Sequence, residues 1–126
     1  MSRAEKQVVL LTGASSGIGK SAARYFLEAG YTVWASARRT ERMADLAEEG
    51  ARSISMDMTE QQSMKDGVRR IMEEHGRIDI LVNNAGYGSF GSLEETPITE
   101  ARRQYEVNIF GLAALTQLVL PAMRKQ

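Results

Sequence analysis

Apolar residues recur along this chain in two patterns, short strand-like segments and stripes with helical spacing. The strand-like segments are residues 7–11, 32–35, 51–56 and 78–83. Between them, apolar residues recur about four positions apart, which predicts helices that each pack one face on a sheet. Strands that alternate with helices predict an α/β fold with a doubly wound parallel sheet.

The first predicted helix has an apolar stripe that ends at a glycine. The members of the stripe are Ile18, Ala22, Tyr25, Phe26 and Ala29. Gly30 follows them, and glycine commonly ends a helix because it adopts a positive φ without steric cost. The stripe is therefore expected to face the sheet.

Three threonines precede the later helical patterns and are predicted to be N-caps. They are Thr40, Thr59 and Thr96, the last followed by Pro97 at the first helical position. The stripes of the first two of these helices consist of Met43, Leu46 and Ala47, and of Met64, Val68, Ile71 and Met72. The third helix is predicted to extend from the Thr96 cap to the end of the sequence.

A glycine-rich turn joins the first strand to the first helix, with the sequence Thr12-Gly13-Ala14-Ser15-Ser16-Gly17-Ile18-Gly19. Glycines at such a turn let backbone N–H groups and the helix N-terminus converge on an anion. The strand, turn, helix and next strand fit within about thirty residues, which is typical of a dinucleotide-binding βαβ unit. A structural turn without a ligand is the alternative, and this context favours a dinucleotide.

Composition limits the classes of function. The 126 residues, 43% apolar and 25% charged, predict a single domain over residues 1–126. Sixteen basic and sixteen acidic residues cancel, which argues against a nucleic acid or an anionic membrane as partner. The absence of cysteine and the single histidine argue against a disulfide, a thiol nucleophile and a metal site. We expect a cytoplasmic protein, because neither a signal-peptide pattern nor an apolar run of membrane length stands out.

Polar residues follow each predicted strand, and the carboxyl ends of parallel strands share one edge of the sheet. They are Ser15 and Ser16, then Arg38 and Arg39, then Asp57, then Asn83 and Asn84. Each has an ordinary explanation as a turn residue or a solvated charge. Their joint placement nevertheless predicts a ligand crevice.

These motifs resemble the short-chain dehydrogenase/reductase family. The resemblance rests on Thr12-Gly13-x-x-x-Gly17-x-Gly19, on Asp57, on Asn83-Asn84-Ala85-Gly86 and on Val107-Asn108, which together span almost the whole chain. It implies a Rossmann-type sheet and an oxidoreductase that acts on a carbonyl or a secondary alcohol. It further implies that Asp57 contacts the adenine amine and that the Asn-Asn-Ala-Gly segment stabilises the sheet beside the nicotinamide ribose.

The same resemblance implies the roles of the remaining site residues. Asn108 matches the catalytic asparagine of the family, which breaks a helix locally so that an exposed carbonyl holds a relay water. The residues expected to bind the cofactor are Gly13, Ser15, Ser16, Gly17, Ile18, Gly19, Arg38, Arg39, Asp57, Met58, Asn84, Ala85 and Gly86.

The residues after the second strand favour NADP(H) over NAD(H). In a dinucleotide fold, an acidic residue at this position binds the ribose 2′-hydroxyl, whereas an arginine nearby receives a 2′-phosphate. Ala37 stands where the acid would be, and Arg38 and Arg39 follow. Two solvated arginines that merely end a strand are the alternative, more so for Arg39 than for Arg38.

The chain departs from the family in lacking its Tyr-x-x-x-Lys motif. The residues four positions after Tyr25, Tyr31, Tyr87 and Tyr105 are Ala29, Ala35, Gly91 and Ile109. The resemblance thus covers an N-terminal, cofactor-binding half, truncated after about four strands and the following long helices. Two hypotheses remain: an NADP(H)-dependent oxidoreductase represented by this fragment, or a non-catalytic NADP(H)-binding or interaction module. A sugar-nucleotide epimerase is a weaker third, because its glycines follow a different spacing.

The last strand and the last helix predict contacts with a second chain. Nothing after residues 78–82 is able to pair with that strand, so it is expected to form an exposed edge. The final helix is apolar around much of its circumference. We therefore expect a homo-oligomer formed through the C-terminal helices or through this edge. Tyr87 and Phe90, in the glycine-containing loop, either line a substrate cleft or anchor the loop.

Overall fold

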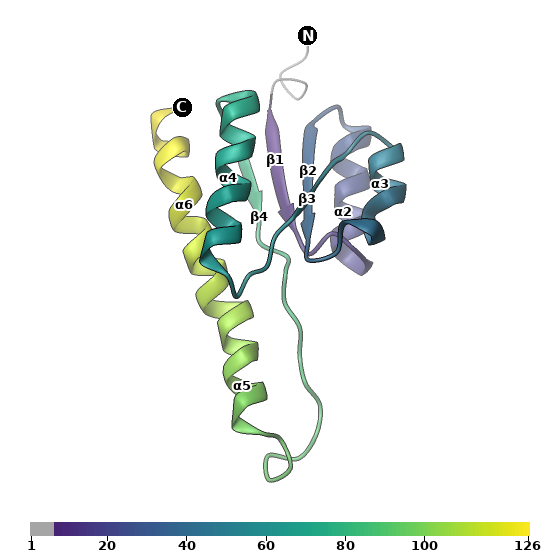
Figure 1. Cartoon of the computed structure of the whole chain (residues 1–126). Coiled ribbons are helices and arrows are strands. Elements are labelled where there is room, and N and C mark those ends of the chain that lie inside the picture. The colour runs from purple at the N-terminus through teal and green to yellow at the C-terminus, as the bar shows by residue number, and fades with distance from the viewer. Residues whose placement is uncertain (1–6) are drawn as a thin grey trace.

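One parallel sheet organises the computed structural model, which describes residues 7–126. Its strands are β1 (Val8–Thr12), β2 (Thr32–Ala37), β3 (Arg52–Ser55) and β4 (Ile80–Val82), in the order β3-β2-β1-β4 (Figure 1). The predicted parallel α/β fold is confirmed, and β4 lies at one edge of the sheet. Residues 1–6, which the domain and signal-peptide predictions included, lie outside the described residues.

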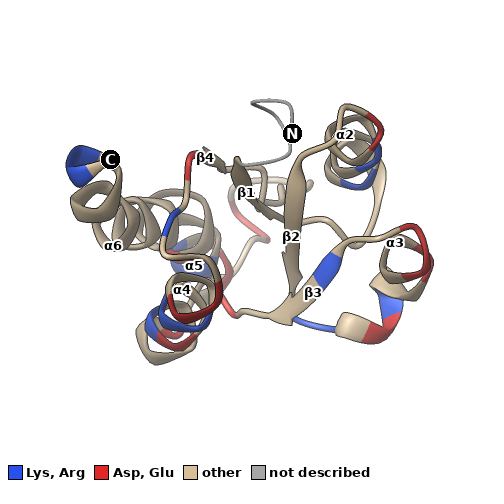
Figure 2. Ribbon diagram, turned by 90° about the horizontal axis from the view of Figure 1, so that it is seen from above, with Lys and Arg blue, Asp and Glu red and all other residues tan. Residues whose placement is uncertain are grey.

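Helices cover both faces of the sheet. The elements are α2 (Gly17–Glu28), the 3-10 turn η1 (Thr40–Met43), α3 (Ala44–Glu48), α4 (Gln61–His75), α5 (Ile98–Tyr105), the π-helical segment η2 (Glu106–Gly111) and α6 (Leu112–Lys125). Figure 2 shows α2 and α3 on one side of the strands and α4, α5 and α6 on the other. The sheet is therefore doubly wound, as the sequence predicted.

The central strand β1 supplies side chains to two separate cores. All five of its residues are buried, because β2 and β4 flank it and helices cover both its faces. Val8 and Leu10 belong to the core beneath α4 and α6, whereas Val9 and Leu11 belong to the core beneath α2 and α3. This alternation follows from the two-residue period of a strand, and it leaves Thr12 as the first polar residue at the strand's carboxyl end.

The predicted apolar face of α2 is partly wrong. Ile18 and Tyr25 are 82% and 74% exposed, while Gly19 and Ala23 are buried against the sheet. Gly19 lies against the Gly13 carbonyl and the Asn84 side chain with no room for a Cβ, and this close approach fixes the face of α2 that is buried, so part of the expected stripe faces solvent. Ala29, another expected member, is exposed at the end of the helix.

The three predicted threonine caps are also wrong. The N-caps of η1, α4 and α5 are Arg39, Glu60 and Pro97, and none of them makes a side-chain capping bond. Thr59 and Thr96 use their hydroxyls elsewhere: Thr59 donates to Asp57 Oδ1 at 2.7 Å, and Thr96 donates to the Ser92 carbonyl at 2.8 Å. Ala47, expected to pack inward, is exposed.

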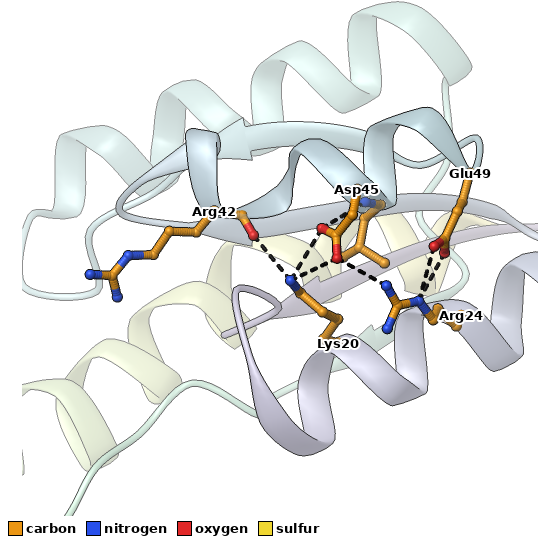
Figure 3. A network of polar contacts seen from close by, with 6 residues as sticks. Lys20, Arg24, Arg42, Asp45 and Glu49 are labelled. Carbon is orange, nitrogen blue, oxygen red and sulfur yellow. Dashed lines mark hydrogen bonds and ion pairs between the residues drawn. The ribbon is translucent and has the colours of Figure 1, made fainter.

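A charged network fastens α3 to α2 (Figure 3). Lys20 Nζ donates to Asp45 Oδ2 at 3.0 Å and to the Arg42 carbonyl at 3.1 Å. Arg24 donates from Nη2 to Asp45 Oδ2 and from Nε to Glu49 Oε2, each at 2.9 Å. The hydrogen bond from Lys20 lowers the pKa of the Asp45 carboxyl, and this effect is larger than the opposing effect of partial burial. The network thus connects the helix that follows the glycine turn to the segment that follows Arg38.

We expect Asp45→Asn to lower the free energy of unfolding at neutral pH and to lose this effect in acid. The folded-state pKa of Asp45 is depressed, so its stabilisation is present above the unfolded value of about 3.9 and disappears as the pH falls through the folded value. Urea unfolding at pH 7 and at about pH 3 measures the difference. The control is Asp66→Asn, whose ion pair with Arg69 lies within one helix. An equal deficit for Asp45→Asn at both pH values would contradict the prediction.

The continuous helical segment Ile98–Lys125 departs from one further expectation. Its 28 residues are long and apolar enough, by length and composition alone, to cross a membrane, whereas no apolar run of that length was expected from the sequence. In the described structure it packs Leu115 and Val119 into the core beside α4. Several large apolar side chains on its other faces are exposed, namely Ile98, Tyr105, Ile109, Phe110 and Leu120.

Candidate functional site

A cleft of about 220 Å³ lies where the carboxyl ends of the strands meet α5 and η2. Its walls come from the first turn, the ends of β2 and β3, the loop after β4, and the two helical segments. The lining residues are Thr12, Gly13, Ser15, Ser36, Ala37, Arg38, Met56, Asp57, Met58, Ala85, Gly86, Tyr87, Arg103 and Val107. Segments far apart in the sequence therefore share one site.

The structure brings about half of the predicted site residues into this cleft. Those that line it are Gly13, Ser15, Arg38, Asp57, Met58, Ala85 and Gly86. Those that do not line it are Ser16, Gly17, Ile18, Gly19, Arg39, Asn84 and Asn108. Several of the second group nevertheless hold the walls in place.

Thr12 and Asn84 fix the glycine turn to the segment after β4. The Thr12 hydroxyl accepts hydrogen bonds from the backbone N–H groups of Asn84 at 3.1 Å and Ala85 at 3.0 Å. Asn84 Nδ2 donates to the Gly13 carbonyl at 3.1 Å. Gly13 has a φ of 68°, and a Cβ there would lie 2.8 Å from the Ala85 Cα. Only glycine allows this close approach, which gives one side of the cleft its shape.

The start of α2 is open to a ligand. Gly17 has a φ of 56°, and no atom lies within 4 Å of a Cβ built on it. Ser16 makes no side-chain capping bond, and the first turn of α2 holds no acidic residue. Since the first N–H groups of a helix lack partners within the helix, an anion such as a pyrophosphate fits this position.

Asp57, which follows β3, shares the cleft with Arg38 and Arg103. Its Oδ1 accepts hydrogen bonds from Thr59 N at 2.8 Å and Thr59 Oγ1 at 2.7 Å. Partial burial acts to raise the pKa of the carboxyl, but these two hydrogen bonds and the charges of Arg38 and Arg103 together lower it. Asp57 is therefore held as a carboxylate in the cleft, able to accept a hydrogen bond from an amine.

Asn108 anchors the loop that carries Tyr87. Its Oδ1 accepts from Tyr87 N at 3.1 Å, and its Nδ2 donates to the Tyr87 carbonyl at 2.7 Å. Asn108 lies in η2, where the helix widens to π geometry, at the place where the resemblance implied a local break. Gly111 closes this segment, and a Cβ there would lie 2.3 Å from the Met58 carbonyl. The π segment therefore sits directly against the residue that follows Asp57.

Tyr87 and Phe90, the two aromatic residues of the loop, differ in position. Tyr87 lines the cleft, whereas Phe90 is fully exposed. Partial burial and then the nearby Glu100 raise the pKa of the Tyr87 hydroxyl, against an opposing effect of Arg103. Ser89 connects the loop to α5. Its backbone N–H donates to Gln104 Oε1 at 2.8 Å, and its hydroxyl donates to Glu100 Oε1 at 3.0 Å.

Sequence reasoning missed Arg103 and Val107, which line the cleft from α5 and η2. Arg103 was not assigned to the site, and Val107 was named only within the Val107-Asn108 motif. A usable signal was present, because residues four positions apart share one face of a helix. Arg103 therefore lies on the same face as Val107, which directly precedes Asn108.

The fold and the cleft define a Rossmann-like α/β protein with a site at the carboxyl ends of its strands. The family model for the short-chain dehydrogenases matches residues 7–126. The chain therefore belongs to the short-chain dehydrogenase/reductase family.

Curated relatives place it within that family at moderate identity. A probable short-chain type dehydrogenase/reductase, VdlC, of Helicobacter pylori is 35% identical over 94% of this chain and 44% of the relative. The 3-ketodihydrosphingosine reductase of Bacteroides thetaiotaomicron is 38% identical over 96% of this chain and 44% of the relative. The chain thus spans less than half the length of either relative.

Solved structures of short-chain dehydrogenases and oxidoreductases have a similar fold over almost all of this chain. A short-chain dehydrogenase from Streptomyces avermitilis has a TM-score of 0.92 and 41% identity, over 99% of this chain and 47% of that chain. A metagenomic short-chain oxidoreductase solved in complex with NADP has a TM-score of 0.84 and 32% identity, over 94% of this chain and 57% of that chain.

Proposed function

We propose that the cleft binds NADP(H), and that the chain is the cofactor-binding part of an oxidoreductase that reduces carbonyls or oxidises secondary alcohols. The observation that carries the proposal is the position of Arg38. It follows Ala37 at the end of β2 and lines the same cleft as Gly13 and Asp57. A guanidinium suits a phosphate dianion, whereas the alanine offers no carboxylate to a ribose 2′-hydroxyl.

The remaining walls of the cleft suit the other parts of this cofactor. The open start of α2 at Gly17 fits the pyrophosphate. The Asp57 carboxylate is a suitable acceptor for the adenine amine, and the segment at Ala85 and Gly86 lies beside the turn, where the nicotinamide ribose is expected. Two relatives of known structure were solved with NADP and with 5-hydroxy-NADP, which supports the choice of cofactor class.

Replacing Arg38 is expected to weaken NADPH binding about tenfold while leaving NADH binding within about twofold, since one charge-assisted bond to the phosphate is lost. The measurement is a fluorescence titration of the chain and of Arg38→Met with each nucleotide. Arg39→Met is the matched control, because Arg39 is exposed and does not line the cleft.

Three results of this titration would contradict the proposed role of Arg38 or the proposed function. Equal losses for NADPH and NADH in Arg38→Met would contradict recognition of the 2′-phosphate. A larger effect of Arg39→Met would transfer that role to Arg39. If the unaltered chain binds neither nucleotide, the proposed function fails altogether.

A non-catalytic NADP(H)-binding module is the second candidate, and one observation favours it. None of the tyrosines in the sequence is followed four residues later by lysine, so the pair that carries proton transfer in this family is absent from these 126 residues. Asn108 alone does not replace that pair, because a side-chain amide donates and accepts hydrogen bonds but neither loses nor gains a proton near neutral pH. The two candidates share the cofactor and differ in turnover.

We further propose that the chain associates with a second copy through α5 and α6. The exposed side chains of Tyr105, Ile109 and Phe110 form an apolar surface on these helices, which supports the proposal. The outer edge of β4, with which no strand within residues 7–126 pairs, is the alternative surface.

A further inference from the structure

Asp57 is held by hydrogen bonds at three of its four polar atoms. Its backbone N–H donates to the Ser63 hydroxyl at 2.9 Å. Its carbonyl oxygen accepts from the Glu60 N–H at 3.0 Å and from the Ser63 hydroxyl at 2.9 Å. Its Oδ1 accepts from the backbone N–H and the hydroxyl of Thr59. Only Oδ2 makes no hydrogen bond or ion pair within residues 7–126.

Ser63 connects Asp57 to α4 without taking part in the cleft itself. It lies in the first turn of that helix and does not line the cleft, whereas Asp57 does. Its single hydroxyl proton is shared between the carbonyl oxygens of Asp57 and Glu60, at 2.9 and 3.0 Å. Because the same hydroxyl also accepts from the Asp57 N–H, it fixes the peptide groups on both sides of the Asp57 Cα.

Thr59 fixes the carboxylate relative to this backbone. Rotation of the Asp57 side chain away from its present orientation would break both bonds to Thr59. The carboxylate is therefore already ordered before a ligand arrives, and binding does not have to pay for that ordering. One oxygen, Oδ2, is left to accept a hydrogen bond from a ligand.

A fixed carboxylate oxygen distinguishes two kinds of purine. An ionised carboxylate accepts hydrogen bonds but donates none. The 6-amino group of adenine has N–H donors to offer it, whereas the 6-oxo group of hypoxanthine presents a second acceptor that the carboxylate repels. A carboxylate that is able to turn away would discriminate less between the two bases.

We propose that Ser63 and Thr59 are positioning residues for the adenine end of the cofactor, and that they give the cleft its preference for an amino over an oxo group on the purine by holding Asp57. This inference rests on the proposed function, in which Asp57 accepts from the adenine amine, and adds two residues that do not line the cleft. Removal of either hydroxyl therefore lowers the base preference and leaves the preference for the 2′-phosphate unchanged.

The experiment titrates each variant with NADPH, NADH and deamino-NADPH, in which hypoxanthine replaces adenine. We expect the unaltered chain to bind NADPH about tenfold more tightly than deamino-NADPH, since one charge-assisted hydrogen bond is lost. Ser63→Ala and Thr59→Val are each expected to lower this ratio to about threefold or less, and to change the ratio between NADPH and NADH by less than about twofold. Ser63→Thr, which keeps the hydroxyl, is expected to retain the base preference.

Two further variants give the limits of the measurement. Gln62→Ala is the matched control, because Gln62 is an exposed neighbour in the same turn of α4 and its side chain bonds to Asp66. We expect it to keep both ratios. Asp57→Asn is expected to lose the base preference, because it removes the carboxylate that the two hydroxyls position. Circular dichroism identifies a variant that does not fold, and the other hydroxyl variant then decides the test.

The outcomes separate this inference from the proposed function. If the unaltered chain binds neither NADPH nor NADH, the proposed function fails and the inference fails with it. If Asp57→Asn loses the base preference while Ser63→Ala and Thr59→Val keep it, only the inference is overturned. Equal affinity of the unaltered chain for NADPH and deamino-NADPH also overturns it. An equal loss of all three nucleotides in Ser63→Ala, or the same change in Gln62→Ala, would indicate a general structural effect and would likewise overturn it.

Discussion

Replacing Gly19 by alanine is expected to destabilise the fold by about 2–3 kcal/mol and to weaken NADPH binding at least tenfold. A Cβ at this position would lie 2.2 Å from the Gly13 carbonyl oxygen and 2.4 Å from Asn84 Nδ2. The added methyl group therefore forces α2 away from the turn, whose backbone shapes one side of the cleft. Alanine favours a helix by about 1 kcal/mol over glycine, so a net loss has to come from this collision.

Urea unfolding and NADPH titration measure the two effects of Gly19→Ala. The control is Gly88→Ala, since no atom lies within 4 Å of a Cβ at Gly88. That variant is expected to unfold at the same urea concentration as the unaltered chain. Wild-type stability and affinity in Gly19→Ala would show that the close contact between α2 and the turn is not required.

The second large effect is expected in an activity assay, where the 126-residue chain binds NADPH but does not oxidise it with any carbonyl compound. The physical reason is the missing proton donor: an ordinary tyrosine has a pKa of about 10, and no lysine follows any of the tyrosines at the family's spacing. Positioned acid–base groups contribute about 10²–10⁴-fold to such reactions. Both side-chain ends of Asn108 are also occupied by the backbone of Tyr87.

NADPH absorbance in the presence of a panel of ketones and aldehydes provides this measurement. The 3-ketodihydrosphingosine reductase of Bacteroides thetaiotaomicron, assayed with 3-ketodihydrosphingosine, serves as the positive control. Steady oxidation of NADPH in proportion to the amount of chain would contradict the prediction and reject the non-catalytic candidate. Binding without turnover would support a cofactor-binding role for these residues alone.

Local patterns were sufficient to predict the strands and the turn. The run that became β1 and the glycines that follow it depend on neighbours within a few residues, and the structure places them as expected. Gly76 ends α4 with a φ of 70°, as a glycine after a helical stripe predicts. The strand order β3-β2-β1-β4 came only from the structure.

Contacts remote in sequence explain where prediction failed. The exposed face of α2 was misassigned because Gly19 packs against Gly13 and Asn84, and no helical periodicity reveals how close two backbones approach. Thr59 was predicted to cap a helix but bonds to Asp57 instead. Arg103 was missed because its position in the cleft depends on how α5 packs beside residues that lie at the end of β3.

By itself, the amino-acid sequence determined the alternation of strands and helices, the glycine turn, and the cationic side chain after β2, since these depend on local conformation and on residue chemistry. Only the tertiary structure decided which side chains share the cleft, which face of α2 is buried, and that Arg103 lines the cleft together with Asp57. The reason is that backbone propensities act over a few residues, whereas the walls of this site come from segments as much as 95 positions apart, from Thr12 to Val107.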